Sequence, residues 1–295
     1  MNGSKALRVL VTGAGGFIGR HVIEAFRNYD VDIVSVSANG REGMLSCNLL
    51  DCSGAERLIR NVRPTHLLHL AWHDHPQKRW SAAENIDWVA ASLHLARAFS
   101  KFDGRRLVFA GSAAQYSWRS ERITEDSVQD PSSLYGAAKS ATERALYAAS
   151  AALGCSIATA RIFYCYGAGE PSGRLVRDLI DDISAGREAR CTDGKQKRDY
   201  LYAVDLGAAL ARVTLGEITG GINVASGAAI PVRMLIEEVA RQLGRPELIQ
   251  YGALARRHDD PPVVEADVSK LKALGFSPRF DLRSGVEDML RRISR

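Results

Sequence analysis

The sequence predicts an α/β protein built on a doubly wound parallel sheet, followed by a smaller lobe. The first half of the chain alternates short runs of apolar, often β-branched residues with longer stretches of helical periodicity. The short runs are apolar on both faces, which is typical of parallel strands covered by helices on both sides. After about residue 167 the alternation stops, and Gly and Pro become frequent.

The elements of the first half follow the order that a parallel sheet requires, because each strand needs a crossover before the next one. Strands are expected at 7–13, 31–37, 66–72, 105–112 and 156–163, and helices at 17–28, 53–61, 80–102 and 133–153.

The second half predicts shorter elements between loops such as "GAGEPSGR" and "HDDPPVVEAD". We therefore assign residues 1–166 to a sheet domain and 167–295 to a smaller lobe. Segments near 198–225 are expected to return to the sheet domain, so that the lobe is partly interleaved with it.

Composition and charge narrow the class of partner. The 295 residues carry a formal net charge of +5, but the arginines are scattered rather than gathered in a stripe or arm. A phosphorylated small molecule fits this pattern better than a nucleic acid does. The five cysteines include no C-x-x-C pair, which indicates reduced thiols. With no apolar run of membrane-spanning length and no signal peptide, we expect a cytoplasmic protein without a membrane partner.

A glycine-rich turn joins the first expected strand to the first expected helix. In "VLVTGAGGFIG", Gly13 permits the tight turn, Gly16 allows close approach of a pyrophosphate, and Gly19 allows close packing of helix on strand. Phe17 and Ile18 lie in the same turn, at a helix N-terminus that favours phosphate. The pattern predicts a Rossmann site for a dinucleotide.

The end of the second expected strand bears on the choice of cofactor. A fold that prefers NAD usually places an acidic residue there to bind the ribose 2′-hydroxyl. This chain has Ser37 instead, with Asn39 and Arg41 after it, and these groups suit a 2′-phosphate. We therefore predict NADP (as NADPH) rather than NAD; the alternative is that Arg41 lies in a solvated loop.

Tyr135 and Lys139 are four residues apart in an expected helix and so share one face. A nearby ammonium lowers the pKa of a phenol and suits it to general acid/base work. Ser112 is expected at the C-terminal end of a strand, where parallel sheets bind ligands, and it can hydrogen-bond the same substrate oxygen. Together these residues predict a catalytic set.

The whole chain resembles the extended short-chain dehydrogenases/reductases of the NAD(P)-dependent nucleotide-sugar epimerase/dehydratase/ketoreductase family. The resemblance rests on the glycine motif at 12–19, "GSAAQY" at 111–116, "YGAAK" at 135–139 and "KRDYLYAVDLGAAL" at 197–210, with further matches at 66–72, 160–167, 221–227 and 266–278. It implies a Rossmann domain, hydride transfer, and a nucleotide-diphosphate sugar bound in the smaller lobe.

The resemblance also implies roles for individual residues. Ser112, Tyr135 and Lys139 would be catalytic, and Tyr135 and Lys139 would also contact the cofactor, with Lys139 on the nicotinamide ribose. The other residues beside the cofactor would include Asn48, Leu49, Leu70, Ala71, Trp72 and Asn85. Substrate would contact His73, Ser112, Tyr164, Arg174, Arg198 and Arg257, since paired arginine donors suit a diphosphate. Two positions depart from the family: Asn48 replaces an Asp, and Tyr164 replaces an Asn that contacts substrate.

The residues after Ser112 favour one reaction of this family over another. Related 4,6-dehydratases have an Asp-Glu pair there, whereas this chain has "AAQYS". We therefore predict an NADPH-dependent reduction at C4 of a nucleotide-linked 4-keto-6-deoxyhexose. A nucleotide-sugar epimerase is the alternative, and a non-catalytic NADP-binding regulator is a third possibility.

Two further features complete the expectations. In "AWHDHPQKRW" (71–80), His73 is a possible second proton donor, Trp72 and Trp80 are expected to pack, and no metal site is expected. Stripes of Ala and Leu on the helices at 80–102 and 133–153 predict a homodimer, as in the family.

Overall fold

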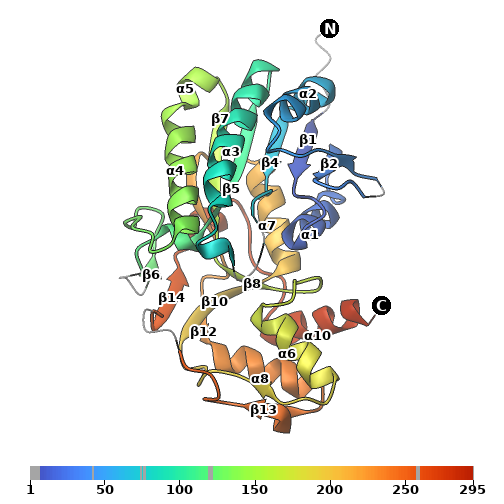
Figure 1. Cartoon of the computed structure of the whole chain (residues 1–295), viewed down its shortest axis with the longest axis vertical. Helices are drawn as coiled ribbons and strands as arrows, with labels where there is room; N and C mark the ends of the chain where they lie inside the picture. The colour runs from blue at the N-terminus through green and yellow to red at the C-terminus, as the bar shows by residue number, and fades with distance from the viewer. Residues whose placement is uncertain are drawn as a thin grey trace.

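The computed structural model describes residues 7–41, 43–73, 75, 78–118, 122–256 and 260–294. A sheet of seven parallel strands forms the larger part of the molecule (Figure 1). Its strands lie in the order β11-β7-β5-β4-β1-β2-β3. Their bounds are β1 Arg8–Thr12, β2 Asp32–Ser37, β3 Leu45–Ser46, β4 His66–His69, β5 Arg106–Ser112, β7 Ser156–Ile162 and β11 Gly220–Val224. The predicted doubly wound α/β fold is confirmed.

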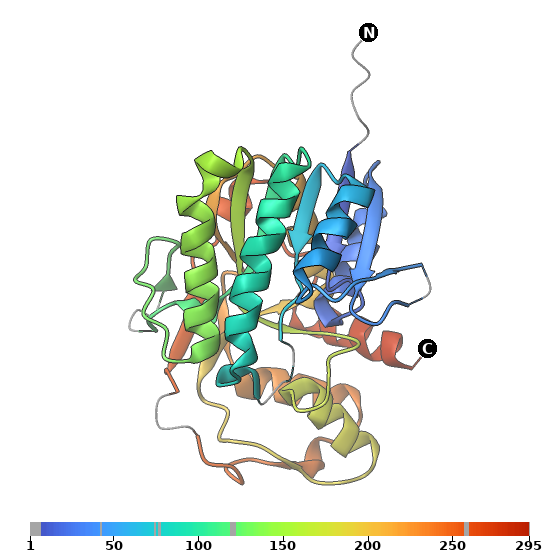
Figure 2. The same cartoon turned by 45° about the horizontal axis from the view of Figure 1, so that its top comes forward.

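Helices cover both faces of this sheet, and the alternation of side chains along the strands creates a core on each side. Leu10, Leu67 and Leu107 point to one core, together with apolar residues of α2 (Cys52–Val62), α3 (Glu84–Lys101) and α4 (Leu134–Ala148). Val9, Leu68 and Val108 point to the other, with α1 (Phe17–Phe26) and α7 (Ala203–Leu215). Figure 2 shows α2, α3 and α4 side by side over one face.

The observed helices are more broken than the sequence predicted. The expected helix at 80–102 is a short 3₁₀ turn, η1 (Lys78–Trp80), followed by α3. The expected helix at 133–153 is α4 followed by α5 (Ser150–Leu153), which ends at Gly154 with φ of 60°. Because a left-handed residue cannot continue a right-handed helix, Gly154 turns the chain into β7.

A smaller lobe lies beyond the carboxyl ends of the strands of the large sheet (Figure 1). Its helices α6 (Leu175–Ser184), α8 (Val232–Gln242) and α10 (Leu282–Ile293) enclose a third core. A second sheet runs β12-β10-β14-β6, with β8 also paired to β10. Its strands are β6 Arg122–Ile123, β8 Tyr164–Tyr166, β10 Lys197–Tyr202, β12 Ala229–Pro231 and β14 Val263–Ala266. The remaining elements are η2 Ala113–Gln115, η3 Pro246–Leu248, β9 Ala189–Arg190, β13 Ile249–Gln250 and α9 Ser269–Ala273.

A buried histidine links three elements of the large domain. His69, at the end of β4, hydrogen-bonds the hydroxyl of Thr12 on β1 at 2.7 Å and that of Ser92 on α3 at 2.9 Å. Burial, and after it the charge of Lys139, lowers the pKa of His69 to about 3. The imidazole is therefore neutral, and it ties β1, β4 and α3 together directly behind the glycine-rich turn.

Within the described part of the chain, no helix combines the length and apolar character that crossing a bilayer requires.

Candidate active site

A single pocket runs from the glycine-rich turn to the smaller lobe. Its volume is about 1130 Å³, above the range of about 300–1,000 Å³ that is usual for one small ligand. Its walls come from the carboxyl ends of β1, β2, β4 and β5 on one side and from β8, β10, α6 and α8 on the other. The pocket therefore has room for a cofactor and a substrate together.

The glycine turn has the shape that a pyrophosphate needs. Gly13 has φ of 70°, and a Cβ there would lie 2.8 Å from the amide nitrogen of Ala71. A Cβ on Gly19 would lie 2.7 Å from Cα of Ala14, so helix and strand can pack closely only without one. Gly16 caps α1 without a side-chain hydrogen bond, which leaves backbone N–H groups facing the pocket. These residues fit a bound dinucleotide.

The predicted ribose-binding residues lie at the far end of the turn. Ser37, Asn39 and Arg41 all line the pocket, with Asn48 and Leu49 beside them. A Cβ on Gly15 would lie 3.4 Å from Cβ of Ser37 and 3.5 Å from Nε of Arg41, so both side chains pack against the glycine loop. The Ser37 hydroxyl oxygen is buried and has no hydrogen-bond partner among the described residues.

Leu70, Ala71 and Trp72 line the pocket where β4 ends, and Asn85 supports them from behind. Asn85 is fully buried and is not one of the residues that line the pocket. Its side-chain oxygen accepts a hydrogen bond from Trp72 Nε1 at 2.8 Å, and its Nδ2 donates to the carbonyl of Arg79 at 2.7 Å. Asn85 therefore links α3, η1 and the end of β4, and its contact with a cofactor stays a prediction.

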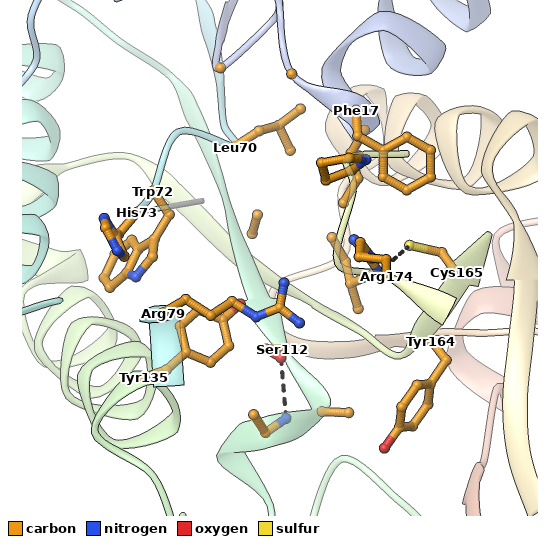
Figure 3. A pocket seen from close by; sticks show the side chains of 18 of the residues that line it. Phe17, Leu70, Trp72, His73, Arg79, Ser112, Tyr135, Tyr164, Cys165 and Arg174 are labelled. Carbon is orange, nitrogen blue, oxygen red and sulfur yellow. Dashed lines mark hydrogen bonds between the residues drawn. The ribbon is translucent and has the colours of Figure 1, made fainter. Parts of the chain in front are cut away.

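Ser112, Tyr135 and Lys139 meet in the middle of the pocket. The Ser112 hydroxyl accepts a hydrogen bond from the amide of Ala114 at 3.2 Å, which holds it at the start of η2 (Figure 3). Ser133 caps α4 by accepting from the amide of Gly136 at 3.1 Å, and this fixes the first turn, which carries Tyr135. The predicted catalytic residues therefore share one site.

The charge that acts on Tyr135 differs from the sequence-based expectation. Burial raises the pKa of the Tyr135 phenol; Arg79, a hydrogen bond to Ser112, and Arg174 oppose that rise. Lys139, which was expected to lower this pKa, donates from Nζ to the carbonyl of Ala110 at 2.8 Å and lies 5.8 Å from the ring centroid of Tyr135. Its ammonium also lies 3.8 Å from the ring centroid of Trp72, and burial holds the pKa of Lys139 well below its usual value.

Arg79 is the site residue that sequence reasoning missed. Figure 3 shows its side chain extending into the pocket toward Tyr135 and Ser112. The only sequence signal was the basic pair Lys78-Arg79 in an unusual segment after the fourth strand. His73, in the same segment, lines the pocket, and its Nε2 atom is buried with no partner among the described residues.

The smaller lobe adds two arginines that are already paired. Arg174 contacts Glu170 at 2.9 Å, and Arg198 contacts Asp260 at 2.5 Å. The guanidinium of Arg198 also lies 5.6 Å from the ring centroid of Tyr164. Tyr164, Arg174 and Arg198, which were predicted to contact the substrate, all line the pocket. Arg257, the remaining predicted arginine, lies outside the described residues, as does Asp74 of the histidine segment. The described residues contain no group of three or more potential metal-binding side chains.

The parallel sheet, the glycine turn and the Ser-Tyr-Lys set in one pocket define an α/β oxidoreductase that uses a nicotinamide dinucleotide. The chain belongs to the NAD-dependent epimerase/dehydratase family, whose model matches residues 9–224. It is an enzyme of this family, as its similarity to enzymes over almost the whole chain also indicates.

Individual relatives carry out different reactions. The UDP-glucose 4-epimerase of Azospirillum brasilense is 29% identical over 95% of this chain and 89% of that protein. The CDP-abequose synthase of Salmonella typhimurium is 22% identical over 97% of this chain and 98% of that protein. Identities at this level place the chain in the family without selecting one activity within it.

Solved structures agree on the fold and on the kind of cofactor. The Thermus thermophilus UDP-glucose 4-epimerase in complex with NAD has a TM-score of 0.86 and 25% identity, covering 97% of this chain and 99% of that chain. The Thermotoga maritima UDP-glucose 4-epimerase with UDP-glucose has a TM-score of 0.87 at 23% identity, covering 97% and 98%. NAD is the cofactor named for such neighbours, and the comparisons lend no support to the predicted preference for NADP.

Proposed function

We propose that this enzyme reduces the keto group of a nucleotide-diphosphate-linked 4-keto-6-deoxyhexose at C4. The observation that carries the proposal is that Tyr135 and Ser112 line the same pocket, where burial raises the pKa of the phenol and favours its neutral, proton-donating form. A reductase needs a protonated acid at this position, whereas the oxidation that begins an epimerase cycle needs a base.

Each residue then has one task. Gly13, Gly16 and the N-terminus of α1 would hold the dinucleotide, which when bound would supply the hydride for the carbonyl carbon. Tyr135 donates its proton to the oxygen that becomes the alcohol, and the Ser112 hydroxyl hydrogen-bonds that oxygen while charge develops on it. A proton from water then restores the phenol. Arg174 and Arg198 contact the diphosphate, and their pairing with Glu170 and Asp260 keeps them oriented before the substrate arrives.

The residues after Ser112 argue against water elimination. Ala113 and Ala114 carry no acid or base, and Gln115 is fully buried. The Gln115 side-chain oxygen accepts from the amide of Ser112 at 2.8 Å, and its Nε2 donates to Glu143 at 2.9 Å. A carboxamide is neither a general acid nor a general base, and this one is held away from the pocket by both hydrogen bonds, so the site lacks the groups that water elimination needs.

NADPH is the proposed reductant. The unpartnered Ser37 hydroxyl and the Arg41 guanidinium lie together against the glycine loop, where a 2′-phosphate would be bound. The support comes from the chemistry of this chain alone, since the named structural neighbours contain NAD.

The test is to incubate purified protein with NADPH or NADH and a panel of nucleotide-linked 4-keto-6-deoxy sugars, and to follow nicotinamide absorbance. Loss of one NADPH per sugar reduced would support a reductase. An inverted sugar centre, seen by NMR without net loss of NADPH, would instead support the second candidate, an epimerase like the Azospirillum relative.

A further inference from the structure

We propose that Arg79 is a positioning residue that acts through Tyr135: its side chain extends into the pocket beside the phenol (Figure 3) and stabilises the negative charge left there when the proton is given away. This role rests on the proposed function, because it takes Tyr135 as the proton donor. It adds a cation from η1 to the one that the helix partner Lys139 was expected to supply.

The first support is the way η1 is held over the site. Asn85 fixes the carbonyl of Arg79, and the amide of Arg79 donates to the carbonyl of His75 at 3.0 Å. The next residue, Trp80, packs the edge of its ring against Tyr135, with ring centroids 5.6 Å apart. Main chain and neighbouring ring therefore bring Arg79 to the phenol in a defined position.

The second support is that the Arg79 side chain lacks a hydrogen-bond partner at Nε. Its guanidinium lies 4.8 Å from the ring centroid of Trp80, and its Nε is buried with no hydrogen-bond partner in the described part of the chain. Burial, and after it repulsion from Arg174, lowers the pKa of Arg79. A buried donor without an acceptor is costly, and an oxyanion that forms during the reaction would supply the missing acceptor.

The third support comes from the other groups around the phenol. Lys139 donates to the carbonyl of Ala110 and Arg174 pairs with Glu170, whereas Nε of Arg79 has no partner in the described part of the chain; Arg79 also precedes Arg174 among the cations that lower the pKa of Tyr135. Cys165 raises the pKa of Tyr135 slightly against these cations, and Ser112 is uncharged. The groups that face Tyr135 are Arg79 and Trp80 from η1, Ser112 from β5, Lys139 from α4, Cys165 from β8 and Arg174 from the segment before α6.

The proton balance during reduction shows why a cation is useful here. The phenolic O–H bond breaks as the new alcohol O–H bond forms, and Tyr135 is left as a phenolate until water reprotonates it. Removing the positive charge of Arg79 makes that phenolate less favourable, so the pKa of Tyr135 must rise further. This rise in the pKa of Tyr135 can be measured without substrate.

The experiment is an ultraviolet difference titration of tyrosinate in the full chain. Each of the wild type, Arg79→Gln and Arg79→Met is compared with the same protein carrying Tyr135→Phe, so that the difference isolates the Tyr135 signal. Arg79→Met keeps an apolar stem against Trp80 and serves if the glutamine variant does not fold. Arg97→Gln, an exposed arginine on α3, is the matched control.

We expect the Tyr135 titration to move to higher pH in both Arg79 variants, to stay in place in Arg97→Gln, and to return toward the wild type in Arg79→Lys. The alkaline limb of the reduction rate should move in the same direction. An unchanged Tyr135 titration in a folded Arg79→Gln or Arg79→Met protein would overturn the proposal. A shifted titration in a protein that reduces no keto sugar would keep the role of Arg79 and overturn the proposed reaction alone.

Discussion

At the scale of single residues, Tyr135 has the most demanding role. Burial must keep its phenol protonated, and the neighbouring cations must allow it to release that proton during the reaction. Replacing it by Phe keeps the ring that packs against Trp80 and removes only the hydroxyl. We expect turnover to fall by about 100-fold or more while cofactor affinity is unchanged. Steady-state rates and a dinucleotide-binding titration on the same preparation measure the two effects, and a fully active variant would refute the assignment.

Arg41 provides a second test at this scale, directed at the cofactor. A guanidinium beside a 2′-phosphate contributes charge-assisted hydrogen bonds that a 2′-hydroxyl cannot use. We expect Arg41→Ala to raise the KM for NADPH by about 10-fold and to leave the KM for NADH nearly unchanged. Equal effects on both cofactors would mean that Arg41 only packs against the glycine loop.

At the scale of elements, the contact of β1, β4 and α3 through His69 should make folding sensitive to acid. The folded protein holds the pKa of His69 at about 3, against 6.5 for the free side chain. A lowered pKa adds stability that is fully present above the unfolded value and is lost as the pH falls, because only the unfolded chain then gains the proton.

We therefore expect the free energy of unfolding to decrease by about 1.4 kcal/mol for each pH unit between 6.5 and 3 on account of this residue. Urea titrations of the wild type and of His69→Gln at several pH values measure the difference between the two slopes. The glutamine variant keeps a donor and an acceptor for Thr12 and Ser92 but cannot take up the proton. Parallel slopes in the two proteins would show that His69 does not titrate in this way.

At the scale of the whole molecule, we expect a homodimer formed through α3 and α4. Exposed residues on these helices include Ile86, which is 62% exposed, and the alanines Ala137, Ala141 and Ala148 on one side of α4. Small side chains allow helices of two copies to approach closely. Sedimentation analysis should give a dimer for the wild type and a monomer for Ala141→Arg. A wild-type monomer at all concentrations would contradict this expectation.

Some residues of the site could be recognised from the sequence, and others only from the fold. Gly13, Gly19, Tyr135 and Lys139 could be recognised because their spacing along the chain carries the signal. Arg79 could not, since its place depends on how residues 71–85 leave β4 and return to α3.

The same limit applies to the hydrogen-bond partners of Lys139 and Asn85, which the sequence does not show. Lys139 lies on the predicted helix face, but only the folded chain shows that the carbonyl of Ala110 takes up its ammonium. Asn85 lies in the expected helix, but only the folded chain shows that its side chain bonds Trp72 and Arg79 behind the pocket wall. Secondary structure and motif position follow from local pattern, whereas the partner of each polar group follows from tertiary packing.

The shared pocket has a kinetic consequence. One enclosure is lined by the glycine turn, by Tyr135 and by the arginines Arg174 and Arg198, and the Arg174 guanidinium lies 5.4 Å from the ring centroid of Phe17 in the glycine turn. A dinucleotide bound at the glycine turn would form part of the wall of the sugar-binding site. The two ligands should therefore enter in a compulsory order and leave in the reverse order, with the dinucleotide first in and last out.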